Sequence, residues 1–173
     1  MAGFSFGQSE DREITNVNTK YNRKYVKSRK TLEGSFPNET HTTIRLLIQK
    51  ELKTIIPDDS NILIQYEQSA TNCIAYNDYG KRQPIVIKNI ADSDKVRLAK
   101  FQTIPFWVYN ANSFFAEHFE NHPDYHLDSG YFKKNIFELN ENCSAFFLLK
   151  SSGEFMIHYG EDYMTEVFNF LKR

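Results

Sequence analysis

The feature that most constrains this fold is a close succession of short apolar runs between Asn61 and Tyr109. The runs are rich in β-branched and aromatic residues, and turn residues such as Asn77 and Gly80 separate them. They occupy residues 62–66, 73–76, 85–87 and 106–109, with a charged, helix-like segment at 94–102 before the last. Runs of this length and composition, bounded by turn residues, predict four β-strands.

An amphipathic helix is predicted just upstream, over residues 40–56. Its apolar side chains recur at helical spacing and would face a sheet. They are Ile44, Leu47, Ile48, Leu52 and Ile55, with Arg45, Gln49, Lys50 and Lys53 assigned to the solvent side. The predicted order is therefore α-β-β-β-α-β.

The second half of the chain adds further expected elements. Its pattern predicts a helix over 111–120, an irregular stretch over 124–142, a hairpin of strands at 145–149 and 154–159, and a closing helix over 163–171. At 173 residues the chain suits one domain. We therefore expect an α/β (α+β) domain over residues 32–173, with a mixed central sheet flanked by helices, and a flexible basic arm at 1–31.

Charge is concentrated in that arm. Arg12 to Lys30 holds seven basic residues and one acid, a net charge of +6, whereas the whole chain carries −1. Cations neutralise phosphates and tyrosine rings stack on bases, so the arm is a candidate contact for DNA or RNA. The candidate residues are Lys20, Tyr21, Arg23, Lys24, Tyr25, Lys27, Arg29 and Lys30. A solvated tether, a strap on the protein's own acidic surface and a nuclear-import signal are alternative interpretations.

The N-terminal residues and the cysteines bear on location. Residues 1–11 contain no apolar core of a signal peptide, and no window reaches eighteen apolar residues. We therefore expect an intracellular protein, cytoplasmic or nuclear, with no membrane span.

Both cysteines, Cys73 and Cys143, lie in or beside apolar runs and are predicted to be buried, reduced thiols.

The element order resembles the core of the PD-(D/E)xK nuclease superfamily, whose acids and lysine hold Mg²⁺ for phosphodiester cleavage. The resemblance covers about residues 40–109 and implies a restriction-endonuclease-like core. It would place the lysine at Lys88, but Val86 stands where the family has an acid, and the second-strand acid would fall near Cys73. Glu67 and Asp78 are the remaining nearby acids. The resemblance therefore implies a degenerate, non-catalytic member.

Three histidines form the other constellation of interest. His118, His122 and His126 are spaced by four residues, and two imidazoles at that spacing on a helix can share a metal ion. Pro123 directly follows His122 and breaks the helical register, so His118 and His122 are only weak metal candidates and surface histidines are the alternative.

These patterns favour a non-catalytic binding or assembly protein without a cofactor. Its partner would be nucleic acid through residues 20–30, a protein through the aromatic-rich second half, or both. Two alternatives stay open: a Mg²⁺-dependent nuclease with a rearranged site at Glu67, Asp78 and Lys88, and a pure protein-interaction module or inhibitor.

Overall fold

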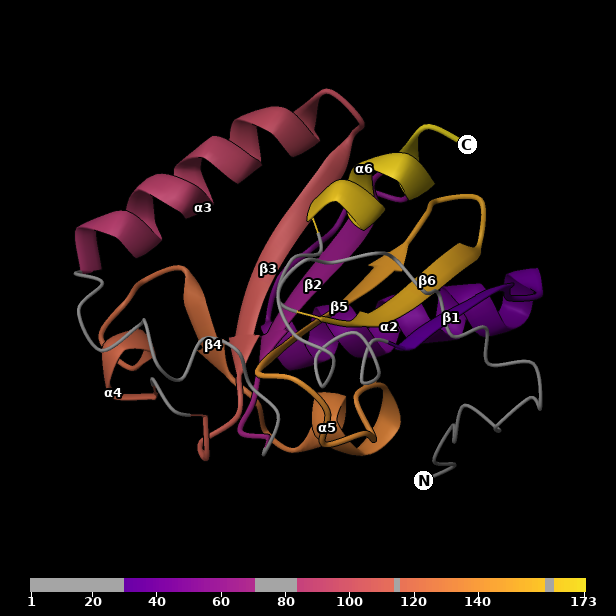
Figure 1. The fold of residues 1–173 in the computed structure, drawn as a ribbon. Helices are drawn as coiled ribbons and strands as arrows, with labels where there is room; N and C mark the ends of the chain where they lie inside the picture. The colour runs from indigo at the N-terminus through magenta and orange to yellow at the C-terminus, as the bar shows by residue number, and fades with distance from the viewer. Residues whose placement is uncertain (1–29, 71–83, 114–115, 161–163) are drawn as a thin grey trace.

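A computed structural model shows a six-stranded mixed sheet with helices on both faces (Figure 1). It describes residues 30–70, 84–113, 116–160 and 164–173. The strand order is β1-β6-β5-β2-β3-β4. The strands are β1 (Lys30–Ser35), β2 (Asn61–Glu67), β3 (Thr103–Tyr109), β4 (Tyr125–Leu127), β5 (Ser144–Leu149) and β6 (Glu154–Tyr159). The expected α/β domain with a mixed central sheet is confirmed.

The sheet has a parallel half and an antiparallel half. Strands β2, β3 and β4 run parallel to one another, whereas β5 is antiparallel to β2 and forms a hairpin with β6. Strand β1 pairs antiparallel with β6 at the sheet edge, and it begins at Lys30, inside the predicted arm. The carboxyl ends of the three parallel strands therefore lie side by side, at one end of these strands.

The helices divide between the two faces. They are α2 (Asn38–Leu52), α3 (Pro84–Ala99), α4 (Ala116–Phe119), α5 (Tyr131–Asn135) and α6 (Met164–Leu171). Helix α2 lies behind the sheet in Figure 1, while α3 and α6 lie in front of it. The side chains of α5 pack on the same face as those of α2.

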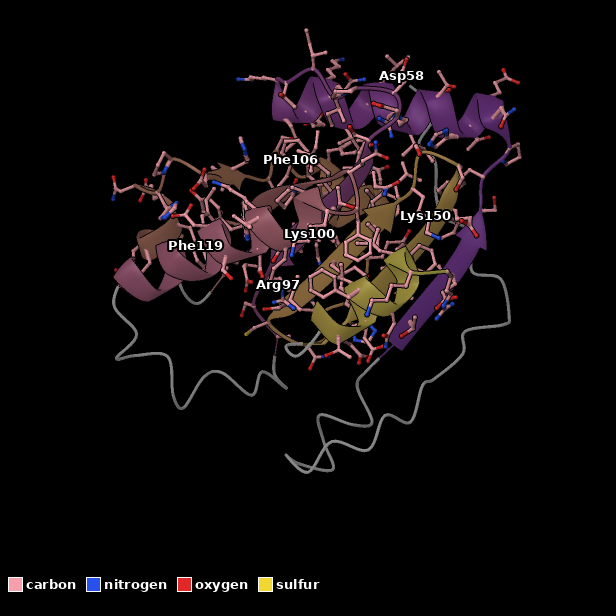
Figure 2. The ribbon with its side chains drawn as sticks, turned by 90° about the horizontal axis from the view of Figure 1, so that it is seen from above. Asp58, Arg97, Lys100, Phe106, Phe119 and Lys150 are labelled. Atoms are coloured by element: carbon pink, nitrogen blue, oxygen red, sulfur yellow. The ribbon has the colours of Figure 1, made fainter. Side chains whose placement is uncertain are left out.

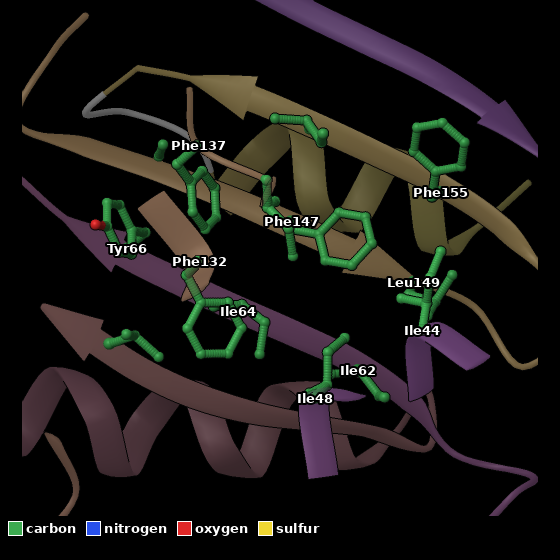
Figure 3. Close-up of a cluster of buried hydrophobic side chains, with 14 of the residues drawn as sticks. Ile44, Ile48, Ile62, Ile64, Tyr66, Phe132, Phe137, Phe147, Leu149 and Phe155 are labelled. Atoms are coloured by element: carbon green, nitrogen blue, oxygen red, sulfur yellow. The ribbon is translucent and has the colours of Figure 1, made fainter. Parts of the chain in front are cut away.

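The buried apolar side chains form two cores, one on each face of the sheet. The core under α2 is the larger one, and Figure 3 shows it. Ile44, Ile48 and Leu52 of the predicted apolar stripe are buried there against β2, β5 and β6. Leu47 is only half-buried, and Ile55 is exposed because α2 ends at Leu52, before the stripe reaches it. The helix prediction is confirmed, and the placement of Ile55 on the sheet-facing stripe is wrong.

The helical spacing predicts Arg45 on the solvent side, but the structure buries it. Its guanidinium donates to the carbonyls of Pro57 (2.6 Å) and Ser60 (2.9 Å). Those bonds hold the connection between α2 and β2 against the helix, and they give both terminal nitrogens of the buried guanidinium an acceptor. Arg45 therefore binds the loop between α2 and β2 instead of facing the solvent.

The second core lies under α3 and α6. Leu63, Phe146 and Met156 of the sheet are buried with Leu98 of α3 and Val167 of α6. On the same face His158 is fully buried, stacks on Phe146 and lies with Nδ1 2.7 Å from the Thr31 hydroxyl. That contact fastens the edge strand β1 to β6.

The predicted strand at 85–87 is wrong, because these residues belong to helix α3. Pro84 occupies the first turn, where its missing N–H is not needed and its fixed φ suits a helix. Apolar residues then recur at helical spacing as far as Ala91 and Leu98, both of which are buried. The short run of β-branched residues predicts a strand, but it opens a 16-residue helix.

Other elements differ in extent from the predictions. Strands at 62–66 and 106–109 and the hairpin at 145–149 and 154–159 are confirmed by β2, β3, β5 and β6. The helix expected over 111–120 is reduced to α4, and the stretch called irregular contains β4 and α5. The predicted strand at 73–76 lies outside the described residues.

Cys143 is buried and disulfide-bonded, so the prediction of a reduced thiol is wrong for this residue. The chain's other cysteine, Cys73, lies outside the described residues.

Among the residues that the structure describes, no helix is both long and apolar enough to cross a membrane.

Candidate functional site

The residues of the nuclease interpretation do not form a site within the described residues. Glu67 ends β2, and its carboxylate accepts hydrogen bonds from the Ser144 hydroxyl at 3.0 and 2.9 Å. Lys88 lies in helix α3 instead of the third strand, and Asp78 lies outside the described residues. The resemblance thus loses the strand that carries the family's acid and lysine, and no site is carried over from it.

The basic arm lies almost entirely outside the described residues. Lys20, Tyr21, Arg23, Lys24, Tyr25, Lys27 and Arg29 precede the first of them. Lys30 is the first residue of β1, where it pairs with Tyr159. The arm therefore joins the domain at an edge strand of the sheet.

The histidines do not assemble a metal centre in the described part of the chain, where no group of three His, Cys, Asp or Glu side chains could hold an ion. His118 is exposed on α4. His122 Nδ1 accepts from the Asp124 N–H at 3.3 Å, and its ring meets that of Tyr125 edge-on. His126 lies on β4, where burial lowers its pKa. The chain leaves the helix at Phe119, so the helical spacing that suggested shared ligands does not persist.

The first cluster of polar side chains lies where ligands usually bind in such sheets, at the carboxyl ends of the parallel strands. We call it the carboxyl edge; it comprises Tyr66, Gln68, Asn110, Asp128 and Lys133. The Tyr66 hydroxyl donates to Asp128 at 2.8 Å and accepts from Asn110 at 3.2 Å. Burial raises the pKa of Tyr66, so the hydroxyl stays protonated and can donate.

Asp128, two residues before the N-cap residue Gly130, also accepts backbone hydrogen bonds at the start of α5. Its carboxylate accepts the backbone N–H groups of Gly130 (3.0 Å), Phe132 (3.0 Å) and Lys133 (2.9 Å). These donors would otherwise lack partners at the helix start. With the Tyr66 hydroxyl, the carboxylate therefore accepts four hydrogen bonds.

Lys133 and Gln68 complete the carboxyl edge. The Lys133 ammonium donates to Asn140 Oδ1 (2.6 Å), Gln68 Oε1 (3.1 Å) and the Leu139 carbonyl (3.4 Å). An ammonium has three donors, so all three have acceptors. Burial lowers the pKa of Lys133, and the charge of Asp128 opposes that shift.

Gln68 holds the loop that follows α5. Its amide nitrogen Nε2 lies 3.0–3.1 Å from the carbonyls of Leu139, Glu141 and Asn142. The hydrogen bonds of the carboxyl edge therefore hold residues 128–142 in place. Its chemistry is that of a structural network.

A second cluster, of exposed cations, lies at the opposite end of the parallel strands. We call it the basic end; it comprises Arg97 and Lys100 near the end of α3, with Lys172 and Arg173 after α6. Figure 2 shows Arg97 and Lys100 beside α6, with Lys150 on its other side. Three segments that are distant in sequence therefore bring cations around one helix.

The phenyl rings of α6 and its neighbours position these cations. The Arg97 guanidinium lies 4.3 Å from the centroid of the Phe168 ring, and the Phe101 ring packs against Phe168 at 5.8 Å. The Arg173 guanidinium lies 5.6 Å from the Phe170 ring, and Lys150 Nζ lies 4.7 Å from it. Cation–π contact holds a cation in place and leaves its charge uncompensated.

Carboxylates neutralise only part of the basic end. Arg173 pairs with Glu33 at 2.7 Å, and Arg97 lies 3.7 Å from Asp94. Asp94 is itself buried, and burial raises its pKa, although the charge of Arg97 works against the shift. Lys100 and Lys172 pair with no carboxylate of the described residues.

Sequence reasoning missed both clusters. The carboxyl edge could have been inferred only if β4 had been recognised, because Asp128 and Lys133 follow that strand. The basic end had a signal in the closing helix, whose apolar face is followed at once by Lys172 and Arg173. Its proximity to Arg97 and Lys100 depends on α3, for which the sequence pattern predicts a strand and a short helix instead.

Comparisons with protein-family models, curated proteins and solved structures find no match to this chain.

Proposed function

We propose that this chain is a non-catalytic nucleic-acid-binding protein that contacts phosphates through the basic end and through the arm at residues 20–30. The observation that carries the proposal is the convergence of exposed cations from α3 and the C-terminus around α6, with Lys100 and Lys172 unpaired among the described residues. The phosphate oxygens of a nucleic acid would supply the negative charge that pairs with these lysines.

The expected mode of binding is independent of sequence. Lysine and arginine contacts to phosphates position a protein on nucleic acid without reading its bases. The rings of Phe168 and Phe170 are occupied by the protein's own cations, so they contribute to positioning rather than to base stacking. Binding should therefore weaken steeply with salt and vary little with base composition.

Fluorescence anisotropy with a labelled single strand of roughly 20 nucleotides tests the basic end. Near 0.15 M salt each phosphate contact is worth about fourfold in affinity, so the double change Lys100→Ser and Lys172→Ser should weaken binding about fifteenfold. The matched comparison is between single changes: Lys100→Ser should weaken binding about fourfold, whereas Lys134→Ser, which removes an exposed lysine from α5 on the other face of the sheet, should not. Equal affinities for these two single variants would overturn the role of the basic end.

The arm is tested separately in the full chain. Replacing Arg23, Lys24, Lys27 and Arg29 together with Ser, and leaving Lys30 of β1 in place, should weaken binding further and flatten its salt dependence. Thermal stability should stay nearly unchanged. A lower melting temperature would instead identify the arm as a strap on its own domain.

A protein partner on the aromatic-rich second half has less support. Most of the rings that the structure describes there, including Phe137, Phe146, Phe147 and Phe155, lie in the two cores. Their abundance is explained by packing, which leaves few of them to meet a partner.

An intracellular location belongs to the same proposal, because nucleic acid is found there. The disulfide-bonded Cys143 argues the other way, since disulfides persist in oxidising compartments. Fractionation of cells that express the full chain tests this part: recovery in the cytosol or the nucleus fits the proposed location, and recovery in an oxidising compartment contradicts it.

A further inference from the structure

The surface at the C-terminal end of α2 is hollowed into a shallow groove of about 730 Å³. We call it the α2 groove. The described residues that line it are Leu46, Gln49, Lys50, Lys53, Thr54 and Ile55. It lies on the opposite side of the sheet from α6, so it is separate from the basic end (Figure 2).

Two aliphatic side chains in the groove are unusually exposed. Ile55 is 92% exposed and Leu46 is 60% exposed. Large apolar side chains that stand together in solvent mark interaction sites more often than singly scattered ones do.

The backbone holds Ile55 in this position. Lys53 ends α2 in the left-handed conformation, with φ of 51°. Gln49 then accepts the N–H of Ile56 at its side-chain oxygen (2.8 Å), and Ile56 is buried. Because Ile56 fills the core position, Ile55 cannot turn inward.

The charge of the groove is positive. Lys50 and Lys53 line it, and no acidic residue is among its described lining residues. An occupant that complements the groove must therefore offer apolar side chains together with carboxylates.

The first eleven residues of this chain have that composition. They contain Phe4 and Phe6, then Glu10 and Asp11, and no basic residue. The following segment, residues 12–30, carries seven basic residues and one acid, so it is repelled by the lysines of the groove.

The connecting segment is long enough for the first residues to reach the groove. Eighteen residues, 12–29, separate them from β1, and a chain of that length spans up to about 60 Å when extended. As a coil its ends lie about 23 Å apart, and a domain of this size has a radius of gyration of about 15 Å. The groove is within that range.

We propose that the α2 groove binds residues 1–11 of the same chain, with Phe4 and Phe6 against Leu46 and Ile55 and the two acids beside Lys50 and Lys53. Docking would tie both ends of the basic arm to the domain, so the arm would present its cations as a closed loop. The proposal does not depend on the nucleic acid partner.

Methyl NMR of the full chain tests the docking. Changing Phe4→Ser and Phe6→Ser removes two ring currents, so the methyl resonances of Leu46 and Ile55 should shift. Those of Ile64, which is buried under α2, and of Val96, which is exposed on α3, should not. The difference should persist on about tenfold dilution, as expected for contact within one chain. Unmoved Leu46 and Ile55 resonances, or a difference that vanishes on dilution, would overturn the proposal.

A peptide of residues 1–11, titrated into the full chain that carries Phe4→Ser and Phe6→Ser, supplies the reciprocal test. Ile55→Ser should weaken peptide binding about tenfold, as for the loss of one buried aliphatic side chain. Val96→Ser is the matched control, because it makes a similar change at another exposed apolar position, and it should have no effect. Lys50→Gln with Lys53→Gln should abolish most of the salt dependence of binding. No peptide binding, or equal binding to the Ile55→Ser protein, would contradict the proposal.

Discussion

The carboxyl edge and the basic end gather charged side chains from distant parts of the chain, but they use them in opposite ways. At the carboxyl edge, Asp128 accepts four hydrogen bonds and Lys133 donates three, all within the protein. At the basic end, Lys100 and Lys172 project into solvent, and Arg97 rests on a phenyl ring.

The difference teaches which cluster holds the fold together and which is available to a partner. A half-buried charge with fixed partners contributes to stability, and removing one partner leaves the others unsatisfied. An exposed cation contributes little to stability, because water already solvates it. Substitutions at the carboxyl edge should therefore change stability, and those at the basic end should change binding.

The largest expected effect comes from Asp128→Ala. The change leaves the Tyr66 hydroxyl and three backbone N–H groups without their acceptor, so the free energy of unfolding should fall by roughly 3 kcal/mol. Urea denaturation measures it. Glu138→Ala, at an exposed acid in the same segment, is the control and should change stability by less than about 0.5 kcal/mol. Equal effects of the two substitutions would mean that the network at Asp128 is not structural.

The next effect concerns Cys143, whose carbonyl accepts the Gln68 N–H at 2.8 Å beside the carboxyl edge. Because Cys143 is disulfide-bonded, it should resist alkylation in unfolded protein that has not been reduced. Reduction should lower stability by about 2 kcal/mol, at the low end for native disulfides. A Cys143 that alkylates fully without reductant contradicts the disulfide.

Tyr66→Phe should have a smaller effect, about 1 kcal/mol at neutral pH, because it removes one hydroxyl while Asp128 keeps three donors. It should also alter the pH dependence. Burial raises the pKa of Tyr66 above its unfolded value near 10, so its contribution is present below that pH and is lost as pH rises. The variant should therefore lose less stability than the wild type between about pH 9 and pH 11. Parallel stability curves above pH 9 would show that Tyr66 is not the group responsible.

The smallest expected effect on stability belongs to the basic end. Lys100→Ser with Lys172→Ser should leave the melting temperature within about 2 °C of the wild type, since neither lysine pairs with a described carboxylate. Calorimetry measures the melting temperature. A clear drop would show that the basic end, like the carboxyl edge, contributes to stability, and would contradict the comparison.

The sequence predicted the elements whose patterns are local. The α2 stripe at Ile44, Ile48 and Leu52, strands β2 and β3 and the final hairpin all carry the period of the structure they form. The run at 85–87 failed because β-branched residues also occur in helices, and only Pro84 and the spacing to Leu98 indicated one.

The two clusters could not be predicted because they depend on which segments become neighbours. Tyr66 and Asp128 meet because β4 pairs with β3, which pairs with β2. Strand β4 is only three residues long, so its sequence pattern is too short to predict it. Arg97 and Phe168 meet because α3 and α6 share a face of the sheet. Neither strand order nor face is encoded in periodicity.

The most direct test of the central claim, that the basic end contacts phosphates, is the salt dependence of single-stranded DNA binding. The logarithm of the association constant should fall linearly with the logarithm of salt concentration, with a slope of about −0.7 per phosphate contact. Lys100→Ser with Lys172→Ser should reduce the steepness of that slope by about 1.4, whereas Lys134→Ser should leave it unchanged. An unchanged slope in the Lys100→Ser and Lys172→Ser protein would contradict the claim.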